Sequence, residues 1–467
     1  MSNSAARAAA IAAAEDHYAS GAFKDTLAAR VAIPTESANP TRQPDLMRYL
    51  TDNIAPAVER MGYRWSIHDN PSPRGGWPFL VAERIEDDNL PTLLTYGHGD
   101  VVLGLDELWT EGDGPWNLKV DGSRWYGRGT ADNKAQHSII MAALERVLET
   151  RGQHGFNSKI LLDMGEEIGS PGLDLFVEQQ KDLLAADMLI ASDGPRMRIE
   201  RPDIKLGNRG SINFELIVDL REGSRHSGHW GGVLSDPGVI LAHAIASIVN
   251  EKGQIKVPGW TPEEIPANVR ALFKDCHVDP GNDFPDIDPD WGEPGLSRAE
   301  KMFGWTSFIV LAFITGQPEN PVNGVQPNAK ATCQLRFTVD ADHTKFLDNL
   351  RTHLDAHGFE QVQVVEPEDN RYFPAQRTNP DDPWVRLTRD SVAATMGEAP
   401  IVVPNSAGGL PSRLFADHLG VPTIWLPHSY TGCKQHGPNE HVLDHLMRDG
   451  LKIMTGIFWD LGDVATV

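Results

Sequence analysis

Five residues of the types that bind divalent metal ions occur along the chain at the ends of apolar runs or in the loops beside them. These are His98, Asp132, Glu167, Asp193 and His436. Any one of them alone would more often be a cap or a hydrogen-bonded turn residue. Two imidazoles and three carboxylates without a thiolate suit a pair of divalent ions with one bridging carboxylate. The matching contexts predict two such ions, with zinc favoured and manganese or cobalt able to substitute.

Two further acids stand beside these ligands. Asp100 follows His98 by two residues, so the alternation of a strand turns both side chains to one face. We expect Asp100 to accept a hydrogen bond from the second nitrogen of His98 and to orient it. Glu166 and Glu167 end an apolar run, and on an extended backbone their side chains point to opposite sides. Glu167 is therefore the predicted ligand and Glu166 the general base, although an exposed acidic turn is the alternative.

The segments around these residues alternate between short apolar runs and stretches of helical spacing. Strands are expected at 78–85, 93–96, 159–164, 188–191 and 422–426. Helices are expected at 23–31, 46–61, 136–150, 173–184, 383–396 and 440–459. The alternation predicts an α/β catalytic domain with a mixed, largely parallel sheet and helices on both faces. Such a fold gathers its functional groups at strand ends.

A different pattern begins near residue 207. Strands are expected at 212–220, 333–339 and 362–365, with helices at 239–249 and 344–357, while 257–304 is rich in Pro, Asp and Trp and is expected to be irregular. The sequence thus predicts an inserted α+β domain at 207–371. The catalytic domain is then formed by 1–206 and 372–467.

The composition restricts the classes of partner and compartment. The 467 residues carry 65 acidic and 42 basic side chains, a formal net charge of -23, which argues against nucleic acid or an anionic membrane as a partner. The three cysteines are too few and too scattered for a disulfide framework. Neither a secretory signal nor an apolar membrane span is recognisable, so we expect a cytoplasmic protein.

Together, these residues and their order resemble a family of zinc metallopeptidases and aminoacylases that includes acetylornithine deacetylase, succinyl-diaminopimelate desuccinylase, glutamate carboxypeptidase and carnosine dipeptidase. The resemblance is carried by the motifs at 97–102, 127–134, 166–167, 192–193 and 436–440. It implies the same five ligands, with Asp132 bridging, and the same roles for Asp100 and Glu166. It also implies that the inserted domain is a lid that forms a homodimer.

Further residues are implicated by the resemblance alone. His226 resembles a histidine that reaches into the partner subunit's active site and helps to polarise the scissile carbonyl. Arg336 resembles an arginine that binds a substrate carboxylate. Asn323 adds a polar contact, and Gly408 and Gly409 resemble a loop that lets the backbone approach the substrate. Without the resemblance, His226 reads as a loop histidine and Arg336 as half of a strand-edge salt bridge.

The chain departs from the family pattern at a few positions. Leu410 stands where many relatives have Ser or Thr, Ala135 replaces a usual glycine, and the spacing from Pro327 to Arg336 is slightly short. The segments around Glu166 and His226 resemble the dipeptidase branch most. We therefore predict hydrolysis of an amide or peptide bond in a dipeptide-like substrate with a free carboxylate. A deacylase of N-acyl amino acids is the alternative, and an inactive metal-binding scaffold is the third.

Overall fold

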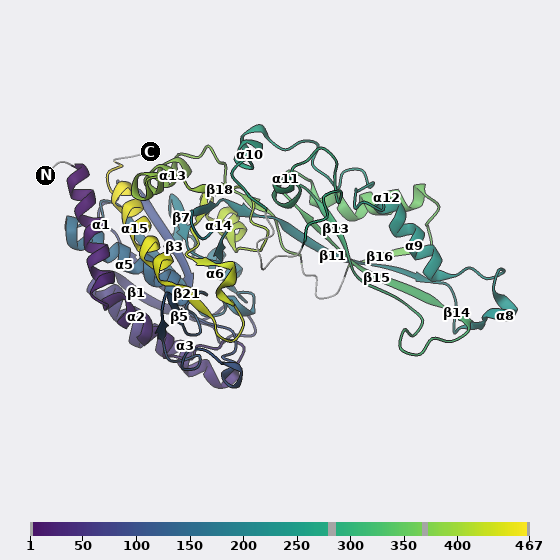
Figure 1. Cartoon of the computed structure of the whole chain (residues 1–467), viewed down its shortest axis with the longest axis horizontal. Coiled ribbons are helices and arrows are strands. Elements are labelled where there is room, and N and C mark those ends of the chain that lie inside the picture. The colour runs from purple at the N-terminus through teal and green to yellow at the C-terminus, as the bar shows by residue number, and fades with distance from the viewer. Residues whose placement is uncertain (1–2, 279–285, 367–371, 465–467) are drawn as a thin grey trace. The chain divides into compact units, whose positions relative to one another are not determined.

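The computed structural model describes residues 3–278, 286–366 and 372–464 and divides into two compact units (Figure 1). Unit 1 comprises Met1–Leu206, Thr378–Val403 and Leu414–Val467. Unit 2 comprises Gly207–Arg377 and Pro404–Arg413. The segments 372–377 and Pro404–Arg413, which the sequence assigns to the second part of the catalytic domain, cluster with unit 2. Within unit 2, the Asn405 side chain donates a hydrogen bond to the carbonyl oxygen of Phe303.

Unit 1 is built on an eight-stranded mixed sheet. In spatial order its strands are β1 (Arg64–His68), β2 (Phe79–Arg84), β6 (Asn157–Asp163), β3 (Thr92–His98), β7 (Met188–Ala191), β19 (Thr423–Trp425), β9 (Asp203–Lys205) and β18 (Ile401–Val403). The central strands β6, β3, β7 and β19 pair in parallel, whereas β1–β2, β2–β6 and β19–β9 are antiparallel. The predicted mixed α/β class is confirmed. The central strands are buried along nearly their whole length, as expected for a parallel sheet that is covered.

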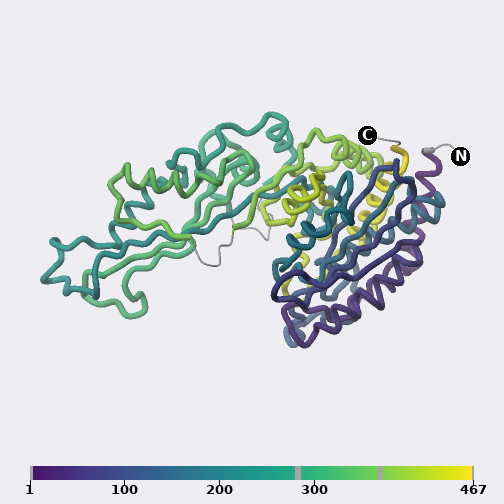
Figure 2. Tube along the Cα trace, turned by 180° about the vertical axis from the view of Figure 1, so that it is seen from behind, coloured from purple at the N-terminus to yellow at the C-terminus, as the bar shows by residue number. Residues whose placement is uncertain are grey.

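The two ends of the chain meet in the helical layer of unit 1. Helix α15 (Asp444–Leu461) packs beside α1 (Asn3–Ala19), α5 (Lys134–Arg151) and α13 (Pro383–Met396), and Figure 2 shows the same arrangement from behind. The expected closing helix at 440–459 begins later, because β21 (His441–Leu443) first pairs with β5 (Arg124–Tyr126). Helix α1 was missed, since its many alanines leave little amphipathic contrast.

Two expected helices of unit 1 are divided in the structure. The stretch at 46–61 consists of α3 (Gln43–Arg48), a π-helical turn (Tyr49–Ile54) and α4 (Ala55–Arg60). The stretch at 173–184 consists of α6 (Leu173–Gln179) and α7 (Lys181–Leu184). Apolar spacing survives such breaks, so the pattern alone does not reveal them.

Unit 2 contains a four-stranded antiparallel sheet in the order β13 (Ser307–Thr315), β15 (Asn328–Phe337), β11 (Gly210–Asp219) and β16 (Val362–Val365). Helices α9 (Pro237–Ile248) and α12 (Phe346–Ala356) pack on it (Figure 1). Strand β13 was not expected from the sequence. The region 257–304 is not wholly irregular, because it contains α10 (Ala267–Leu272) and α11 (Arg298–Phe303); residues 279–285 of it lie outside the described residues.

Candidate metal centre and substrate-binding residues

Three neighbouring parallel strands of unit 1 end beside one another and present acidic and imidazole groups. His98 is the last residue of β3. Glu166 and Glu167 lie in a short 3-10 helix (Glu166–Ile168) just after β6, and Asp193 follows β7 by two residues. The carboxyl ends of parallel strands meet at one edge of a sheet, so residues distant in sequence come together there.

Asp132, from the loop ahead of α5, lies between two histidines. Its Oδ1 is 2.9 Å from His98 Nε2, and its Oδ2 is 3.1 Å from His436 Nε2. His436 comes from the loop before β21, and the side-chain amide of Gln435 also donates to the Oδ2 of Asp132. Thus the two oxygens of one carboxylate face different imidazoles. This is the arrangement that a bridging carboxylate needs.

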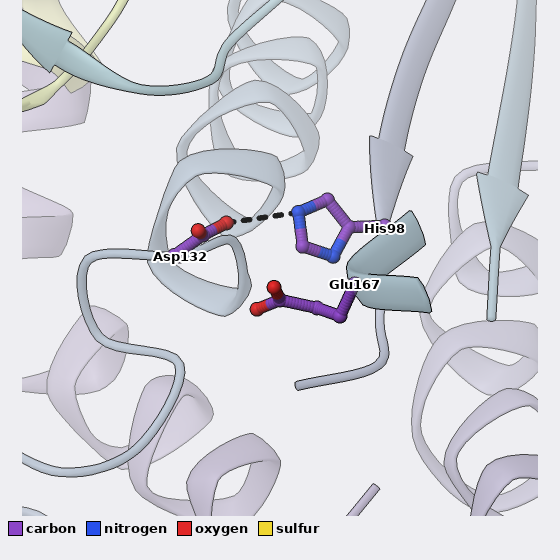
Figure 3. A group of neighbouring side chains, drawn as sticks. All are labelled: His98, Asp132 and Glu167. Atoms are coloured by element: carbon purple, nitrogen blue, oxygen red, sulfur yellow. Dashed lines mark hydrogen bonds and ion pairs between the residues drawn. The ribbon is translucent and has the colours of Figure 1, made fainter. Parts of the chain in front are cut away.

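The remaining carboxylates divide between the two histidines. Asp193 Oδ2 is 3.7 Å from His98 Nε2, whereas Glu167 Oε2 is 3.0 Å from His436 Nε2. One donor atom each from His98, Asp132 and Glu167 lies within 4.8 Å of the others (Figure 3). The five side chains therefore form two groups of three donors that share Asp132. Nitrogen and oxygen donors of this kind fit zinc and similar divalent ions.

Asp100 contacts both His98 and the 3-10 helix. The Nδ1 of His98 lies 3.2 Å from the carbonyl oxygen of Asp100 and 3.4 Å from its Oδ1, which leaves Nε2 directed at Asp132. The Asp100 carboxylate also accepts the backbone N–H groups of Glu166 and Glu167, each at 3.1 Å. One buried acid thus orients a histidine and fixes the start of the segment that carries the two glutamates.

The two glutamates differ in exposure, but not for the reason that the sequence offered. Their backbone is helical rather than extended, so an alternating strand does not separate them. Glu167 is 2% exposed and contacts His436. Glu166 is 27% exposed, and its Oε2 lies 3.9 Å from His98 Nε2. The more accessible carboxylate is thus next to the centre without being in close contact with either histidine.

The carboxylates of the centre are crowded and buried. Burial, with the charge of Asp132, raises the pKa of Glu167 to about 7 and that of Asp193 to about 6. Burial alone would raise the pKa of Asp132, yet hydrogen bonds with His436 and His98 hold it below its ordinary value. The same contacts with Asp132 and Glu167 raise the pKa of His436 to about 10. Such a cluster calls for positive charge, which divalent ions supply.

Glu440 is a residue whose contribution sequence reasoning missed. Its Oε1 accepts backbone N–H groups from Gly129 at 3.1 Å, Ala131 at 2.8 Å and Asp132 at 3.2 Å. Its Oε2 lies 2.7 Å from Arg128 Nη1, and both side chains are buried. Glu440 therefore ties the loop of Asp132 to the segment that follows His436. Its place in the 436–440 motif was the available signal, but nothing in the sequence disclosed the backbone donors.

His226 and Asn323 lie together in unit 2. His226 ends β12 (Arg225–His226), which pairs with β14 (Gly324–Val325), and its Nδ1 accepts the N–H of Gly228 at 3.1 Å. The N–H of Ser227 donates to the carbonyl of Asn323 at 3.0 Å. His226 is exposed at this position. Figure 1 shows α8 (Ser227–Trp230) and β14 together at one end of the unit 2 sheet.

Arg336 lies near the opposite end of that sheet. It stands near the end of β15, between Ser211 of β11 and Ser307 of β13. Its Nε donates to Gln334 Oε1 at 3.2 Å, and among the described residues it forms no salt bridge. The eight steps along the strand from Asn328 to Arg336 span roughly 27 Å. The structure therefore does not bring Arg336 together with His226 within one chain.

The two glycines predicted to approach the substrate belong to the Pro404–Arg413 segment of unit 2. A side chain at Gly408 would meet open space. At Gly409, a Cβ would come within 2.8 Å of the Phe373 ring, so packing against that ring explains the glycine there. The adjacent Ser406 accepts the N–H of Arg209 at 3.0 Å, which ties this segment to the start of β11.

The family of the chain follows from its comparison with known proteins. A model of the peptidase family M20/M25/M40 matches residues 94–460, a range that holds all five predicted ligands. The chain belongs to this peptidase family. The predicted resemblance to the zinc metallopeptidases is thereby confirmed, and this peptidase is a metal-dependent hydrolase.

Individual relatives match most of this peptidase. The β-Ala-His dipeptidase of Rattus norvegicus is 30% identical over 483 residues, covering 94% of this chain and 92% of the relative. The cysteinylglycine-S-conjugate dipeptidase of Corynebacterium striatum is 27% identical over 341 residues, or 71% of each chain. The crystal structure of human carnosine dipeptidase 1 has the same fold, with a TM-score of 0.71 and 21% identity over 97% of this chain and 98% of that one.

A helix that crosses a membrane must be both long and apolar. Within residues 3–278, 286–366 and 372–464, no helix is both long enough and apolar enough to cross a bilayer.

Proposed function

We propose that the protein is a dinuclear metallodipeptidase, which hydrolyses the peptide bond of a small substrate with a free carboxylate. The observation that carries this proposal is the position of Asp132, whose two oxygens face His98 and His436 separately. A single metal site would not need one carboxylate between two imidazoles. The names of the rat and Corynebacterium relatives, both dipeptidases, support the substrate class.

Each proposed ion site takes three side chains. His98, Asp193 and Asp132 would hold one ion, and His436, Glu167 and Asp132 the other. Zinc is the ion that we propose, with manganese or cobalt as substitutes. When bound, two such ions polarise a carbonyl and make water a nucleophile near neutral pH.

The protein's own residues would supply proton transfer and orientation. We assign the general base to Glu166, because it is the accessible carboxylate beside His98 and no histidine contacts it closely. It would take a proton from the attacking water and return it to the leaving amine. Asp100 would keep His98 Nε2 directed at the centre. Arg336 would bind the substrate carboxylate through its planar fork.

The test is a substrate panel on protein stripped of metal and reloaded. We expect no turnover after chelation and recovery on adding zinc, manganese or cobalt, with dipeptides cleaved at least about tenfold faster than N-acyl amino acids. The reverse preference would make the protein a deacylase of N-acyl amino acids. No cleavage of either class by fully loaded protein would favour an inactive metal-binding scaffold.

We further propose that the protein is a homodimer through the edge strand β13 of unit 2. One edge of β13 is open, since β15 is its only neighbour in the described sheet. Its Ile309, Leu311, Phe313 and Ile314 are between 42% and 51% exposed. A long, apolar, unprotected edge is a liability that pairing with a second copy removes. Twofold symmetry would pair the two β13 strands with each other.

The proposed dimer would allow His226 a role that it does not have within a single chain. A dipeptide is far shorter than the distance of roughly 27 Å along β15 that separates the regions of His226 and Arg336. One substrate therefore does not contact both within a single chain. We propose that His226 serves the partner's substrate, with Asn323 beside it, and that the exposed Trp230 and Val233 nearby are covered in the dimer.

We propose a cytoplasmic location on chemical grounds. Cys333 and Cys433 are buried thiols that form no disulfide with any described residue. Free cysteines without disulfides are usual in a reducing compartment, where disulfides are rare. Imaging of the protein with a fluorescent tag, combined with fractionation, tests this location.

A further inference from the structure

A small cavity lies inside unit 1 and is lined by residues of helix α2 (Ala22–Val31), helix α5 and their neighbours. Its volume is about 40 Å³. Helix α2 supplies Arg30 to its wall, and α5 supplies Ser138 and Met141. A single water needs roughly 10–15 Å³ of such space, so the cavity can hold a monatomic ion or a few waters. All of its lining residues belong to unit 1, and the cavity is therefore complete without unit 2.

Arg30 brings a buried positive charge to the wall of this cavity. Only 2% of the residue is exposed to solvent. Its Nε donates to Asn53 Oδ1 at 3.0 Å and its Nη1 to Ser138 Oγ at 2.6 Å. Its Nη2 contacts the sulfur of Met141 at 3.4 Å. These three partners are neutral and occupy three of the five N–H donors of a guanidinium, and no described residue forms a salt bridge with Arg30.

Another buried arginine of unit 1 shows how the chain neutralises such a charge. The side chain of Arg128 is fully buried, and its Nη1 lies 2.7 Å from Glu440 Oε2. Arg30 has no such carboxylate. Burial lowers the pKa of Arg30, and the charge of Glu145 offsets this only in part. Because a buried charge is unfavourable unless it is paired, we expect the counterion of Arg30 to come from outside the chain.

The other charged groups of the lining leave the cavity positive. Arg60 is exposed and lines the cavity together with the exposed Thr26, which gives an ion access from solvent. Glu145 is the one acid among the described residues of the lining, and its Oε2 already lies 2.7 Å from Arg146 Nη2. His17 lines the same cavity, and burial lowers its pKa below 6.5, so its imidazole is neutral at pH 8.

We propose that this cavity binds a monatomic halide, chloride above all, through the remaining N–H donors of Arg30. A large anion such as gluconate does not fit the space of about 40 Å³. The bound ion would lie between the last turn of α2 and the first half of α5, and would stabilise the packing of these two helices. It would take no part in the reaction at the metal centre, so the inference is independent of the proposed function.

The test replaces sodium gluconate by sodium chloride at pH 8 and constant ionic strength and measures the melting temperature of the zinc-loaded protein by calorimetry. We expect wild type to melt about 2–3 °C higher at about 200 mM chloride. Arg30→Met should melt at the same temperature in both salts. So should Ala142→Val, which keeps every charge but adds two methyl groups at a position that lines the cavity. Crystals soaked in bromide should show an anomalous peak beside Arg30.

Three further variants test the charges around the cavity. Glu145→Gln removes the acid of the lining and should lower the chloride concentration that gives half of the shift, by about fivefold. Arg60→Gln should raise that concentration only about twofold, because the charge of an exposed arginine is screened by salt. Arg64→Gln removes a side chain that is 81% exposed on β1 and should respond to chloride as wild type does.

Two results would overturn the inference. One is a wild type whose melting temperature is equal in chloride and gluconate, which would mean that waters alone fill the cavity. The other is a chloride response that persists in Ala142→Val, which would place the halide elsewhere, such as at the metal centre. If Arg30→Met does not fold, Ala142→Val and the position of the bromide peak decide. Failure to cleave any dipeptide would leave all of these outcomes unaffected.

Discussion

The two units differ in whether their charged groups contact one another within the chain. In unit 1, the groups of the candidate centre contact one another: Asp132 lies between His98 and His436, Glu167 contacts His436, and Asp100 supports the glutamates. In unit 2, the groups expected to meet substrate stand apart or exposed. His226 and Arg336 lie at opposite ends of one sheet, and neither forms a salt bridge with a described residue.

This difference indicates which polar groups need a partner from outside the chain. A polar group that is satisfied inside the chain needs nothing more, whereas one left unpaired in a partly buried place needs a ligand or another subunit. Unit 1 therefore contains a centre that one chain can build alone. For unit 2, we propose that Arg336 needs a substrate and that His226 needs a second copy of the chain.

The largest effect is expected inside unit 1, from Glu166→Gln. Loss of the general base should lower kcat about 1,000-fold, within the range for proton-transfer groups. Metal content should remain unchanged, because Glu166 is not among the six donors of the two proposed sites. Turnover by steady-state assay and bound zinc by atomic absorption check the two parts. Glu178→Gln, an exposed glutamate on α6, is the matched control.

The opposite result would contradict the assignment of Glu166 as the general base. If Glu166→Gln kept its turnover but lost zinc, the roles of the two adjacent glutamates would be exchanged. Glu167→Gln in parallel separates these cases, since it should lose zinc from the site of His436.

The next effect tests the reliance of unit 2 on a partner. His226→Ala should lower kcat about 100-fold, because a group that polarises the scissile carbonyl is lost. When His226→Ala and Glu166→Gln subunits are mixed equally, random pairing makes half of the dimers mixed, and each has one intact site. Activity should return to about a quarter of wild type. Mixing that restores nothing would place His226 in its own subunit's site or in no site.

Much of the candidate metal centre could be predicted from the sequence, because its residues follow recognisable local patterns. His98 and Asp100 end an apolar run, and Glu166-Glu167 and Asp193 follow two others, so strand ends alone direct attention to them. The pairing of each carboxylate with a histidine could not be predicted. It depends on the loop of His436, which reaches the centre from the far end of the chain.

Unit 2 was harder to predict for a physical reason. The exposed strand β13 is continuous and apolar, with no alternation to mark it as half-buried, and its pairing is with residues that follow it in the chain.

A smaller effect on the centre is expected from Glu440. Glu440→Gln removes the charge that pairs with buried Arg128 and weakens the hydrogen bonds to the Asp132 loop. Zinc affinity should therefore fall about 10-fold in Glu440→Gln and about 100-fold in Glu440→Ala. Competition titration with a chelator measures this. Asp460→Asn, which breaks the distant ion pair with Arg7, should lower stability without changing zinc affinity. Unchanged affinity in Glu440→Ala would show that unit 1 fixes Asp132 by other contacts.

The smallest expected effect concerns the stability of the protein in acid. It tests whether a buried histidine of unit 1 contributes to the loss of stability as the pH falls. His154 is fully buried, stacks on Phe156 and donates from Nε2 to the carbonyl of Leu144 at 3.2 Å. Burial, only partly offset by the charge of Glu86, lowers its pKa from 6.5 to about 4. Between these values the unfolded chain binds a proton that the folded chain does not. The contribution of His154 to stability is therefore complete above pH 6.5 and is lost as the pH falls toward 4.

At pH 5.5, proton binding by His154 in the unfolded chain lowers the free energy of unfolding by about 1.4 kcal/mol relative to neutral pH. His154→Phe keeps a ring against Phe156 and removes the titration, so the fall in melting temperature between pH 7.5 and pH 5.5 should shrink by about 2–4 °C. Calorimetry at both pH values measures it, and kcat at pH 7.5 should not change. An unaltered acid shift in His154→Phe would mean that other groups, such as the carboxylates of the metal centre or the histidines of unit 2, set the acid sensitivity of the fold.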